Sequence, residues 1–195
     1  MTRAARAAAA LAAAALIAVP ALAASSAVRY PENPPLAHTG GFGEPTCHAC
    51  HFESPPIADS DALSVTGIPA QVAPGEAYPL EVRLTSPGMR RAGFQLAIRF
   101  AEGKKAGGQA GTLASADDRA ATGTSETDSL RIMYAHHTRA GTALTSTDTA
   151  IWRLVWTAPE SAARIMIHVV ANAANDDASE FGDIIHTRSY AIEVH

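Results

Sequence analysis

The sequence predicts an all-β fold built as an antiparallel β-sandwich. Short segments with alternating apolar and polar residues recur along the chain after residue 61, and turns containing Gly and Pro separate them. In one such segment Phe94, Leu96, Ile98 and Phe100 fall on one face of the strand. Apolar residues at helical spacing are scarce beyond residue 23, which argues against an all-α fold. Short alternating strands at nearly regular intervals are typical of two packed sheets.

The strand pattern is clearest in the segments 62–66, 78–84, 94–100, 130–134, 151–156, 164–170 and 190–194. Residues 102–128 are rich in Gly, Ala, Ser and Thr, which predicts a long surface loop with a short strand near Thr112. Trp152 and Trp156 fall on the same face of their strand, and we expect them in the core of the sandwich.

Residues 1–23 have the pattern of a secretory signal peptide. Arg3 and Arg6 give a positive start, an apolar run occupies 7–19, and an Ala-Leu-Ala sequence ending at Ala23 has small residues at cleavage-site spacing. A transmembrane anchor is the alternative, but the apolar run is short for a bilayer and ends in this cleavage site. Cleavage near Ala23 predicts a periplasmic or secreted product without a transmembrane anchor.

The mature chain divides into a Pro- and Gly-rich segment at 24–60 and the predicted sandwich at 61–195. The formal net charge of the whole chain is −4, and the loss of Arg3 and Arg6 with the signal peptide makes it −6. A mildly acidic domain without a Lys/Arg cluster is a poor partner for nucleic acid or an anionic membrane surface. It does suit docking to a basic redox protein, which we expect as its partner.

The N-terminal segment contains the sequence Cys-His-Ala-Cys-His at 47–51, a C-x-x-C-H motif. Two thiols at this spacing lie on one turn and can each form a thioether bond to the same porphyrin, while the next imidazole binds the iron. Thr46 precedes the motif and predicts a short helical turn that it caps. We therefore expect one covalent haem c, held by Cys47, Cys50 and His51.

Cysteines at this spacing also occur in zinc sites, redox-active pairs and disulfides. A zinc site needs two further ligands, for which His38 and His48 are candidates. A thioredoxin-like pair needs a βαβ context that the sequence lacks. A disulfide between Cys47 and Cys50 would close too small a loop to stabilise the fold much. The sequence therefore favours haem, with zinc as the alternative.

The motif does not supply a second axial ligand for the iron. Alternation places Tyr134 and His136 on one face of their strand and Met133 and His137 on the other. If the first pair faces the core, His137 and Met133 point toward whatever covers the outside. The candidate ligands are His38, His136, His137, His168, His186, Met89, Met133 and Met166.

The stretch 37–51, with the sequence Ala-His-Thr-Gly-Gly-Phe-Gly-Glu-Pro-Thr-Cys-His-Ala-Cys-His, resembles the N-terminal segment of bacterial exported Reeler-like domains of the choice-of-anchor type. Shorter matches follow in the same order, at Pro74-Gly75 with Tyr78, 93–96, His137-Thr138, 156–159, 172–175 and Gly182-Asp183.

This resemblance covers nearly all of the mature chain. It implies an immunoglobulin-like β-sandwich with the haem-motif segment packed against it. It also implies His137 as the second iron ligand beside His51, because a His-Thr pair recurs at that place.

These patterns together predict an exported monohaem c-type cytochrome that transfers one electron, a carrier rather than a catalyst. The alternative is an extracellular binding or adhesion module whose haem is structural or replaced by a zinc site. Phe42 and Phe52 flank the motif and are expected to cover haem edges. The acidic loop at 172–183 has enough oxygen ligands for calcium, but its spacing is not that of an EF-hand, and a solvated turn with Asx-type hydrogen bonds is the simpler interpretation.

Overall fold

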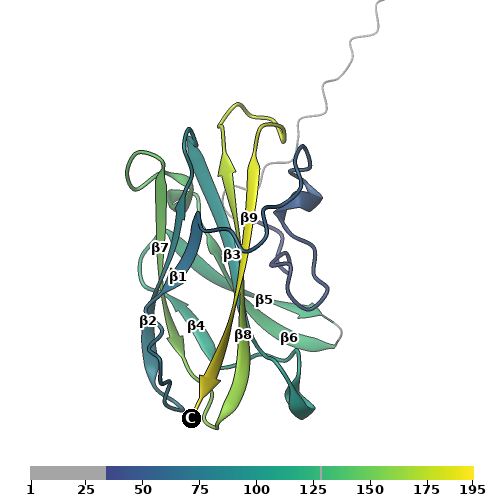
Figure 1. Ribbon diagram of the computed structural model, residues 1–195, viewed down its shortest axis with the longest axis vertical. Coiled ribbons are helices and arrows are strands. Elements are labelled where there is room, and N and C mark those ends of the chain that lie inside the picture. The colour runs from purple at the N-terminus through teal and green to yellow at the C-terminus, as the bar shows by residue number, and fades with distance from the viewer. Residues whose placement is uncertain (1–33, 128) are drawn as a thin grey trace, which may run out of the picture.

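The computed structural model describes residues 34–127 and 129–195 (Figure 1), so the predicted signal peptide at 1–23 lies outside the described residues. Three short 3-10 turns occur in the described part, η1 (Cys47–Ala49), η2 (Gly103–Lys105) and η3 (Ala140–Thr142). The strands there are β1 (Leu63–Thr66), β2 (Ala77–Thr85), β3 (Arg91–Phe100), β4 (Thr112–Ser115), β5 (Ala120–Thr127), β6 (Leu130–His137), β7 (Thr149–Thr157), β8 (Ala163–Ala174) and β9 (Ile184–Val194).

The strands form two antiparallel sheets that pack on each other as a sandwich. One sheet has the order β1-β2-β7-β4, and the other has the order β5-β6-β3-β8-β9. In Figure 1 the four-stranded sheet lies on the left and the five-stranded sheet on the right. The all-β antiparallel sandwich predicted from the strand pattern is confirmed.

The core between the sheets is built from the alternating apolar residues of both. Trp152 and Trp156 on β7 are fully buried, as predicted. The ring of Trp152 stacks on that of Phe94 at 4.6 Å, and its indole N–H donates to the carbonyl of Gly141 at 3.0 Å. The indole of Trp156 donates likewise to the carbonyl of Ala110. The polar atom of each buried tryptophan is thus satisfied without water.

The predicted loop at 102–128 is wrong in its second half. A short strand does form near Thr112, as β4, but residues 120–127 form β5, which pairs with β6 over its whole length. This segment has the sequence Ala-Ala-Thr-Gly-Thr-Ser-Glu-Thr, without the large alternating apolar residues that mark a strand. It is an edge strand, so its pairing depends on backbone hydrogen bonds to β6 rather than on a buried face.

The N-terminal segment, described over residues 34–60, covers the outer face of the five-stranded sheet. Leu36 and Ala37 pack on a second, smaller apolar cluster made by Ala97 of β3 with Ile132 and Tyr134 of β6. Figure 1 shows this segment beside β5, β6, β8 and β9, on the side away from the other sheet. The five-stranded sheet is therefore buried on both faces in this region.

The two faces of β6 are opposite to the assumption made from the sequence. Ala135 and Met133 pack against the main core between the sheets, whereas Ile132 and Tyr134 lie under the N-terminal segment. His136 shares this outer face and is 5% exposed. Both faces of the strand are apolar because both are covered, and alternation alone cannot distinguish a core from a second buried layer.

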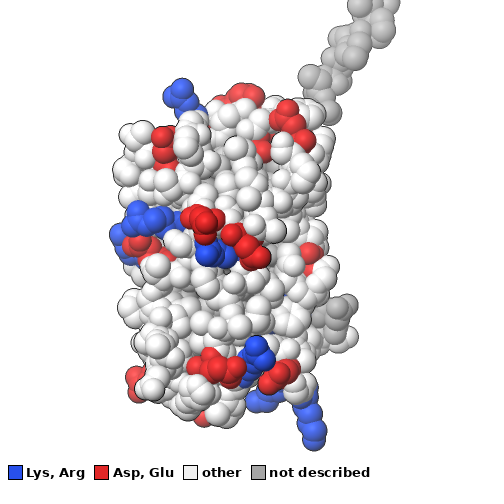
Figure 2. All heavy atoms as spheres, in the orientation of Figure 1, with Lys and Arg blue, Asp and Glu red and all other residues white. Residues whose placement is uncertain are grey.

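The surface carries its charges in small groups of mixed sign. On the face drawn in Figure 2, acidic and basic side chains lie next to each other, with uncharged surface between the groups. Arg83, Glu81 and Arg153 form one such group, with ion-pair distances of 2.7 and 3.5 Å. Over 34–127 and 129–195, none of the helical turns has the length and apolar character of a membrane span.

Candidate haem-attachment site

The C-x-x-C-H motif lies on the short turn η1, as the sequence predicted. Thr46 caps the turn, since its hydroxyl oxygen accepts the backbone N–H of His48 at 3.2 Å. The N–H groups of Cys50 and His51 then donate to the carbonyl of Cys47 at 3.2 and 3.0 Å. These bonds fold the chain back on itself, so Cys47, Cys50 and His51 are held together at one turn.

The two thiols are unpaired and differ in environment. Cys50 is exposed, whereas Cys47 is half-buried by its exposed area. Its thiol is nevertheless closely surrounded, and this burial, with a smaller contribution from the neighbouring Cys50, raises the pKa of Cys47 to about 12. The Cys47 thiol is therefore protonated at neutral pH.

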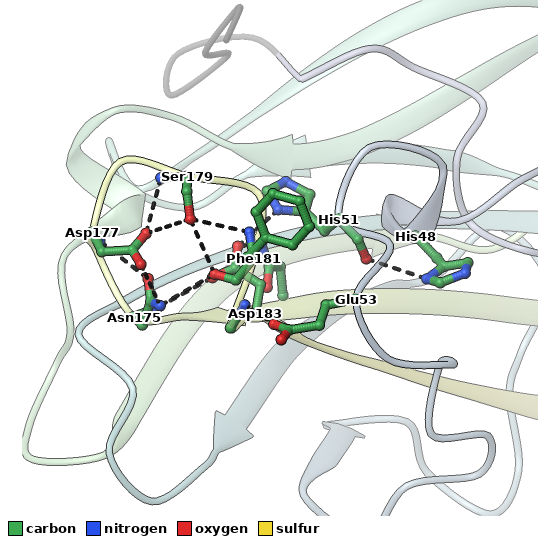
Figure 3. A network of polar contacts seen from close by, with 10 residues as sticks. His48, His51, Glu53, Asn175, Asp177, Ser179, Phe181 and Asp183 are labelled. Carbon is green, nitrogen blue, oxygen red and sulfur yellow. Dashed lines mark hydrogen bonds and ion pairs between the residues drawn. The ribbon is translucent and has the colours of Figure 1, made fainter.

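His51 contacts a buried carboxylate from the other end of the chain. Its Nδ1 lies 2.7 Å from Oδ2 of Asp183, which precedes β9 and has a side chain only 3% exposed. The two atoms are in contact, but the geometry at Nδ1 is not that of a well-aligned hydrogen bond. The amide of Asn172 donates to the same oxygen at 2.9 Å, and the backbone N–H of Asn175 donates to Oδ1 at 3.2 Å. Figure 3 shows Asp183 and Phe181 beside His51.

The two residues after His51 also contact this loop between β8 and β9. The rings of Phe52 and Phe181 meet edge to face, with centroids 5.5 Å apart. The carboxylate of Glu53 accepts the backbone N–H of Gly182. Three consecutive residues of the motif region thus contact three consecutive residues of the β8–β9 loop. The motif is held in place by a segment about 130 positions away in sequence.

Phe52 and Phe181 are exposed although they are aromatic. Their exposed fractions are 52% and 49%, and Phe52 directly follows His51 in the sequence while Phe181 lies beside His51 in Figure 3. An exposed aromatic pair next to two thiols and an imidazole offers the apolar surface that a porphyrin ring needs. Phe42, the other predicted haem contact, is used differently. Its ring packs edge-on against His168, and the guanidinium of Arg99 lies over it at 4.5 Å.

The sequence alone does not place Phe181 and Asp183 at this site. It shows Asp183 only as part of the acidic loop at 172–183, with Phe181 inside that loop. The available signal was a large apolar residue inside a polar loop, which often marks a contact surface. Nothing in the sequence linked that loop to residue 51, because the link arises only when β9 pairs beside β8.

The remainder of the acidic loop forms Asx-type turns, as expected. The carboxylate of Asp177 accepts the backbone N–H and the hydroxyl of Ser179, both at 2.9 Å, and Asn175 accepts the N–H of Asp177 at 3.0 Å. The two bonds from Ser179 lower the pKa of the exposed Asp177 carboxyl. In the part of the chain that the structure describes, no three His, Cys, Asp or Glu side chains are grouped for a metal ion.

His137 lies where the pairing between β3 and β6 ends. Its Nδ1 lies 3.1 Å from the backbone nitrogen of Phe94 and 3.3 Å from the carbonyl oxygen of the same residue. The ring also covers Gly93, where an added Cβ would approach its Cε1 to 2.8 Å. Because Ala92 and Phe94 face the core, a Cβ at Gly93 would point to the outer face. The ring of His137 therefore reaches the outer face across a glycine.

Residues paired across β3 and β8 connect His137 to the surroundings of His51. Gly93 is the partner of Asn172 in the pairing of β3 with β8, so the His137 ring and the Asn172 side chain lie over adjacent positions of one face. Asn172 in turn binds Asp183, which contacts His51. Both expected iron ligands thus lie at the same end of the same face, and the role of His137 as a ligand stays a prediction.

The other candidate histidines make polar contacts within the protein. His38 Nδ1 lies 2.8 Å from the carbonyl of Leu36, and His48 Nδ1 lies 3.2 Å from the carbonyl of His51. The remaining histidine contacts are His136 Nδ1 with the carbonyl of His137, His168 Nδ1 with Ser189 Oγ, and His186 Nδ1 with Ser60 Oγ. Burial lowers the pKa of both His168 and His186.

The methionine candidates make their contacts with the two sheets of the sandwich. Met89 is buried in the main core, and the sulfur of Met133 accepts the N–H of Leu113 at 3.2 Å. Met166 lies on β8 in register with Arg99 and Ala191. A hollow of about 590 Å³ near Arg91 and Asp148 contains none of the motif residues.

Comparison with known proteins gives structural similarity only. No protein-family model matches the sequence, and no curated protein is significantly similar to it. The reeler domain of human F-spondin is 17% identical at a TM-score of 0.46, with 73% of this chain and 95% of that domain covered. A structure of the Reelin-N domain of F-spondin is 16% identical at 0.46, covering 76% and 97%.

A cohesin module from a Clostridium perfringens family 33 glycoside hydrolase is 10% identical at a TM-score of 0.41, with 70% of this chain and 98% of the module covered. Reeler domains are thus among the structures that this chain resembles. Similarity at this level assigns neither a family nor a function to the chain.

Proposed function

We propose that this chain is an exported c-type cytochrome that carries one haem c on Cys47 and Cys50, with His51 as the proximal iron ligand, and that it transfers single electrons. The observation that carries the proposal is the contact of His51 Nδ1 with buried Asp183, on the turn that also presents two unpaired thiols. A ring held through Nδ1 leaves Nε2 as the atom available to a metal. The motif, the free thiols and the oriented imidazole all support covalent haem attachment with iron ligation by His51.

When bound, haem supplies a one-electron iron couple whose potential depends on the axial ligands and on burial. The protein contributes the attachment and the surroundings. Cys47 and Cys50 hold the ring, and the exposed pair Phe52 and Phe181 provides an apolar wall for it. Because the motif lies on the surface of the N-terminal segment, an edge of the ring would remain open to a partner. The formal charge of −6 after signal cleavage suits a basic redox protein as that partner.

His137 is the second iron ligand in this proposal. Its Nδ1 lies within reach of both the N–H and the carbonyl oxygen of Phe94. In the tautomer that carries its proton on Nδ1, the ring donates to that carbonyl and the acceptor lone pair of the ring is on Nε2. The backbone of Phe94 can therefore hold His137 in either tautomer. The resemblance to exported Reeler-like domains of the choice-of-anchor type, with their immunoglobulin-like sandwich, belongs to this proposal as well.

The attachment is tested by exporting the full chain from a host that has haem-attachment machinery. We expect a denaturing gel to stain for haem, the intact mass to exceed that of the mature polypeptide by one haem, and the leader to be absent. Cys50→Ser should lose one thioether bond, and His48→Ala, a matched change inside the motif, should keep the haem. A mature protein of bare polypeptide mass would overturn the proposal and favour the adhesion or zinc alternative.

The second ligand is tested by His137→Ala in the haem-loaded protein. We expect the six-coordinate low-spin absorption spectrum to become five-coordinate and high-spin, with carbon monoxide binding gained. His136→Ala is the adjacent control and should leave the spectrum unchanged. An unaltered low-spin spectrum in His137→Ala would remove His137 from this role without affecting the attachment at Cys47 and Cys50.

A further inference from the structure

We propose that Asp183 is a positioning residue that fixes the orientation of His51 and, by making its imidazole a stronger donor, lowers the reduction potential of the iron. This inference rests on the proposed function, because it concerns the ligand of the attached haem. The Gly182-Asp183 pair is one of the matches that carry the family resemblance, but neither the resemblance nor the motif gives Asp183 this role.

The first argument is the place of the carboxylate. Asp183 Oδ2 lies 2.7 Å from Nδ1 of His51, and the Asp183 side chain is 3% exposed whereas that of His51 is 33% exposed. The imidazole is thus bound on its buried side and open on the other. With Nδ1 against the buried carboxylate, Nε2 is the ring nitrogen left for the iron.

The second argument is the charge around Asp183. It accepts hydrogen bonds from the side-chain amide of Asn172 and the backbone N–H of Asn175, and both donors are neutral. Neutral donors hold the carboxylate in place without cancelling its charge. His51 is therefore the group on which this buried negative charge acts at short range.

The third argument is rigidity. Asn172 belongs to β8, where it pairs with Gly93 of β3 and Ile185 of β9, so Asp183 is bound to the middle of a sheet. Contacts of Phe52 with Phe181 and of Glu53 with Gly182 hold the loop against the motif. Asp183 and His51 therefore cannot move apart unless these contacts with the sheet and with the motif region are broken. A carboxylate held rigidly in this way keeps the imidazole in one orientation.

The consequence for the iron follows from general ligand chemistry. A carboxylate in contact with the Nδ1–H side of a metal-bound imidazole raises the basicity of that ligand. A more basic ligand stabilises the ferric state, which has the higher positive charge, more than the ferrous state. The reduction potential is therefore lower with Asp183 than with a neutral acceptor in its place.

The test is the midpoint potential of haem-loaded Asp183→Asn, which keeps the shape and removes the charge. We expect the equilibrium constant for reduction to rise by about tenfold or more, which is a shift of about +59 mV for a one-electron couple. In the five-coordinate ferrous form of the His137→Ala background, resonance Raman should show the iron–histidine stretch at lower frequency when Asp183 is replaced by Asn. Asp183→Glu should restore part of both values.

Asp177→Asn is the matched control, because it removes the same charge from the same loop. The hydrogen bonds of the Asp177 carboxylate go to Ser179 and Asn175 within the loop rather than to His51. We expect a change in potential less than a third of that in Asp183→Asn. Equal changes in the two variants would mean that only loop charge matters and would overturn the inference.

A second variant keeps the inference testable if Asp183→Asn does not fold. Asn172→Ala removes the amide that shares Oδ2 with His51, so the carboxylate acts more strongly on the ring and the potential should fall. An unchanged or higher potential in Asn172→Ala would contradict the inference while the cytochrome assignment stands. A wild-type protein without attached haem would instead refute the proposed function itself, which separates the two failures.

Discussion

Glu44 and Arg99 form an ion pair between the N-terminal segment and the five-stranded sheet, with Oε1 and Nη1 2.8 Å apart and side chains 2% and 3% exposed. The same carboxylate accepts the hydroxyls of Tyr134, at 2.5 Å, and of Thr39, at 2.6 Å. Arg99 also donates to the carbonyl of Gly107. This network joins the segment that carries the cysteines to the sheet beneath it.

Glu44→Ala should destabilise the protein by about 3–5 kcal/mol, because it leaves the Arg99 guanidinium buried without its partner. Urea denaturation followed by tryptophan fluorescence measures this loss. Arg83→Ala, which breaks the exposed pair with Glu81, is the control and should cost about 1 kcal/mol or less. A Glu44→Ala midpoint as close to the wild type as that of Arg83→Ala would show that the segment is not anchored through this pair.

The two thiols of the haem-free protein should differ strongly in reactivity. Burial raises the pKa of Cys47 to about 12, so its reactive thiolate is scarce near neutral pH, whereas Cys50 is exposed. We expect Cys47→Ser, which retains Cys50, to react with a thiol reagent at least about tenfold faster than Cys50→Ser, which retains Cys47. Absorbance at neutral pH follows the reaction. Similar rates for the two variants would contradict the buried placement of Cys47.

Gly93→Ala should destabilise the protein through the ring of His137. The added methyl would lie 2.8 Å from Cε1 and 2.9 Å from Nδ1 of that ring, which must move away from the backbone of Phe94. We expect a loss of about 1–3 kcal/mol in chemical denaturation. In the His137→Ala background the same methyl should cost much less. Strict additivity in this double-mutant cycle would mean that the ring and Gly93 do not touch.

His186 should make the stability fall in mild acid. Burial lowers its pKa below the ordinary value of 6.5, so in the window below 6.5 the unfolded state binds more protons than the folded state. The contribution of neutral His186 to the free energy of unfolding is fully present above pH 6.5 and is lost as the pH falls toward the folded-state pKa. Nδ1 contacts Ser60, and the buried Nε2 has no hydrogen-bond partner among the described residues.

His186→Gln should therefore reduce the dependence of the unfolding free energy on pH between about pH 7 and pH 5. Urea titrations at several pH values measure this dependence. His195→Gln, at the exposed end of β9, is the control and should retain the wild-type dependence. The prediction is refuted if all three proteins lose stability equally on acidification.

Several strand positions are predictable because apolar and polar residues alternate along their sequences. The segments around Leu80, Phe94 and Trp152 show this pattern, and each of them forms a strand. β5 was missed because its residues are small and its edge position requires little burial. The faces of β6 were assumed wrongly because the N-terminal segment covers Tyr134 and makes a second apolar layer.

The sequence by itself determined the local chemistry: the spacing of Cys47, Cys50 and His51, the Thr46 cap on their turn, and the alternation that builds two sheets. These features depend on residues a few positions apart, where covalent geometry limits the outcome. Only the tertiary structure decided which distant groups meet them. Asp183 reaches His51, and the ring of His137 crosses Gly93, because strand pairing brings these positions to one end of the sheet, and register is set by the whole fold.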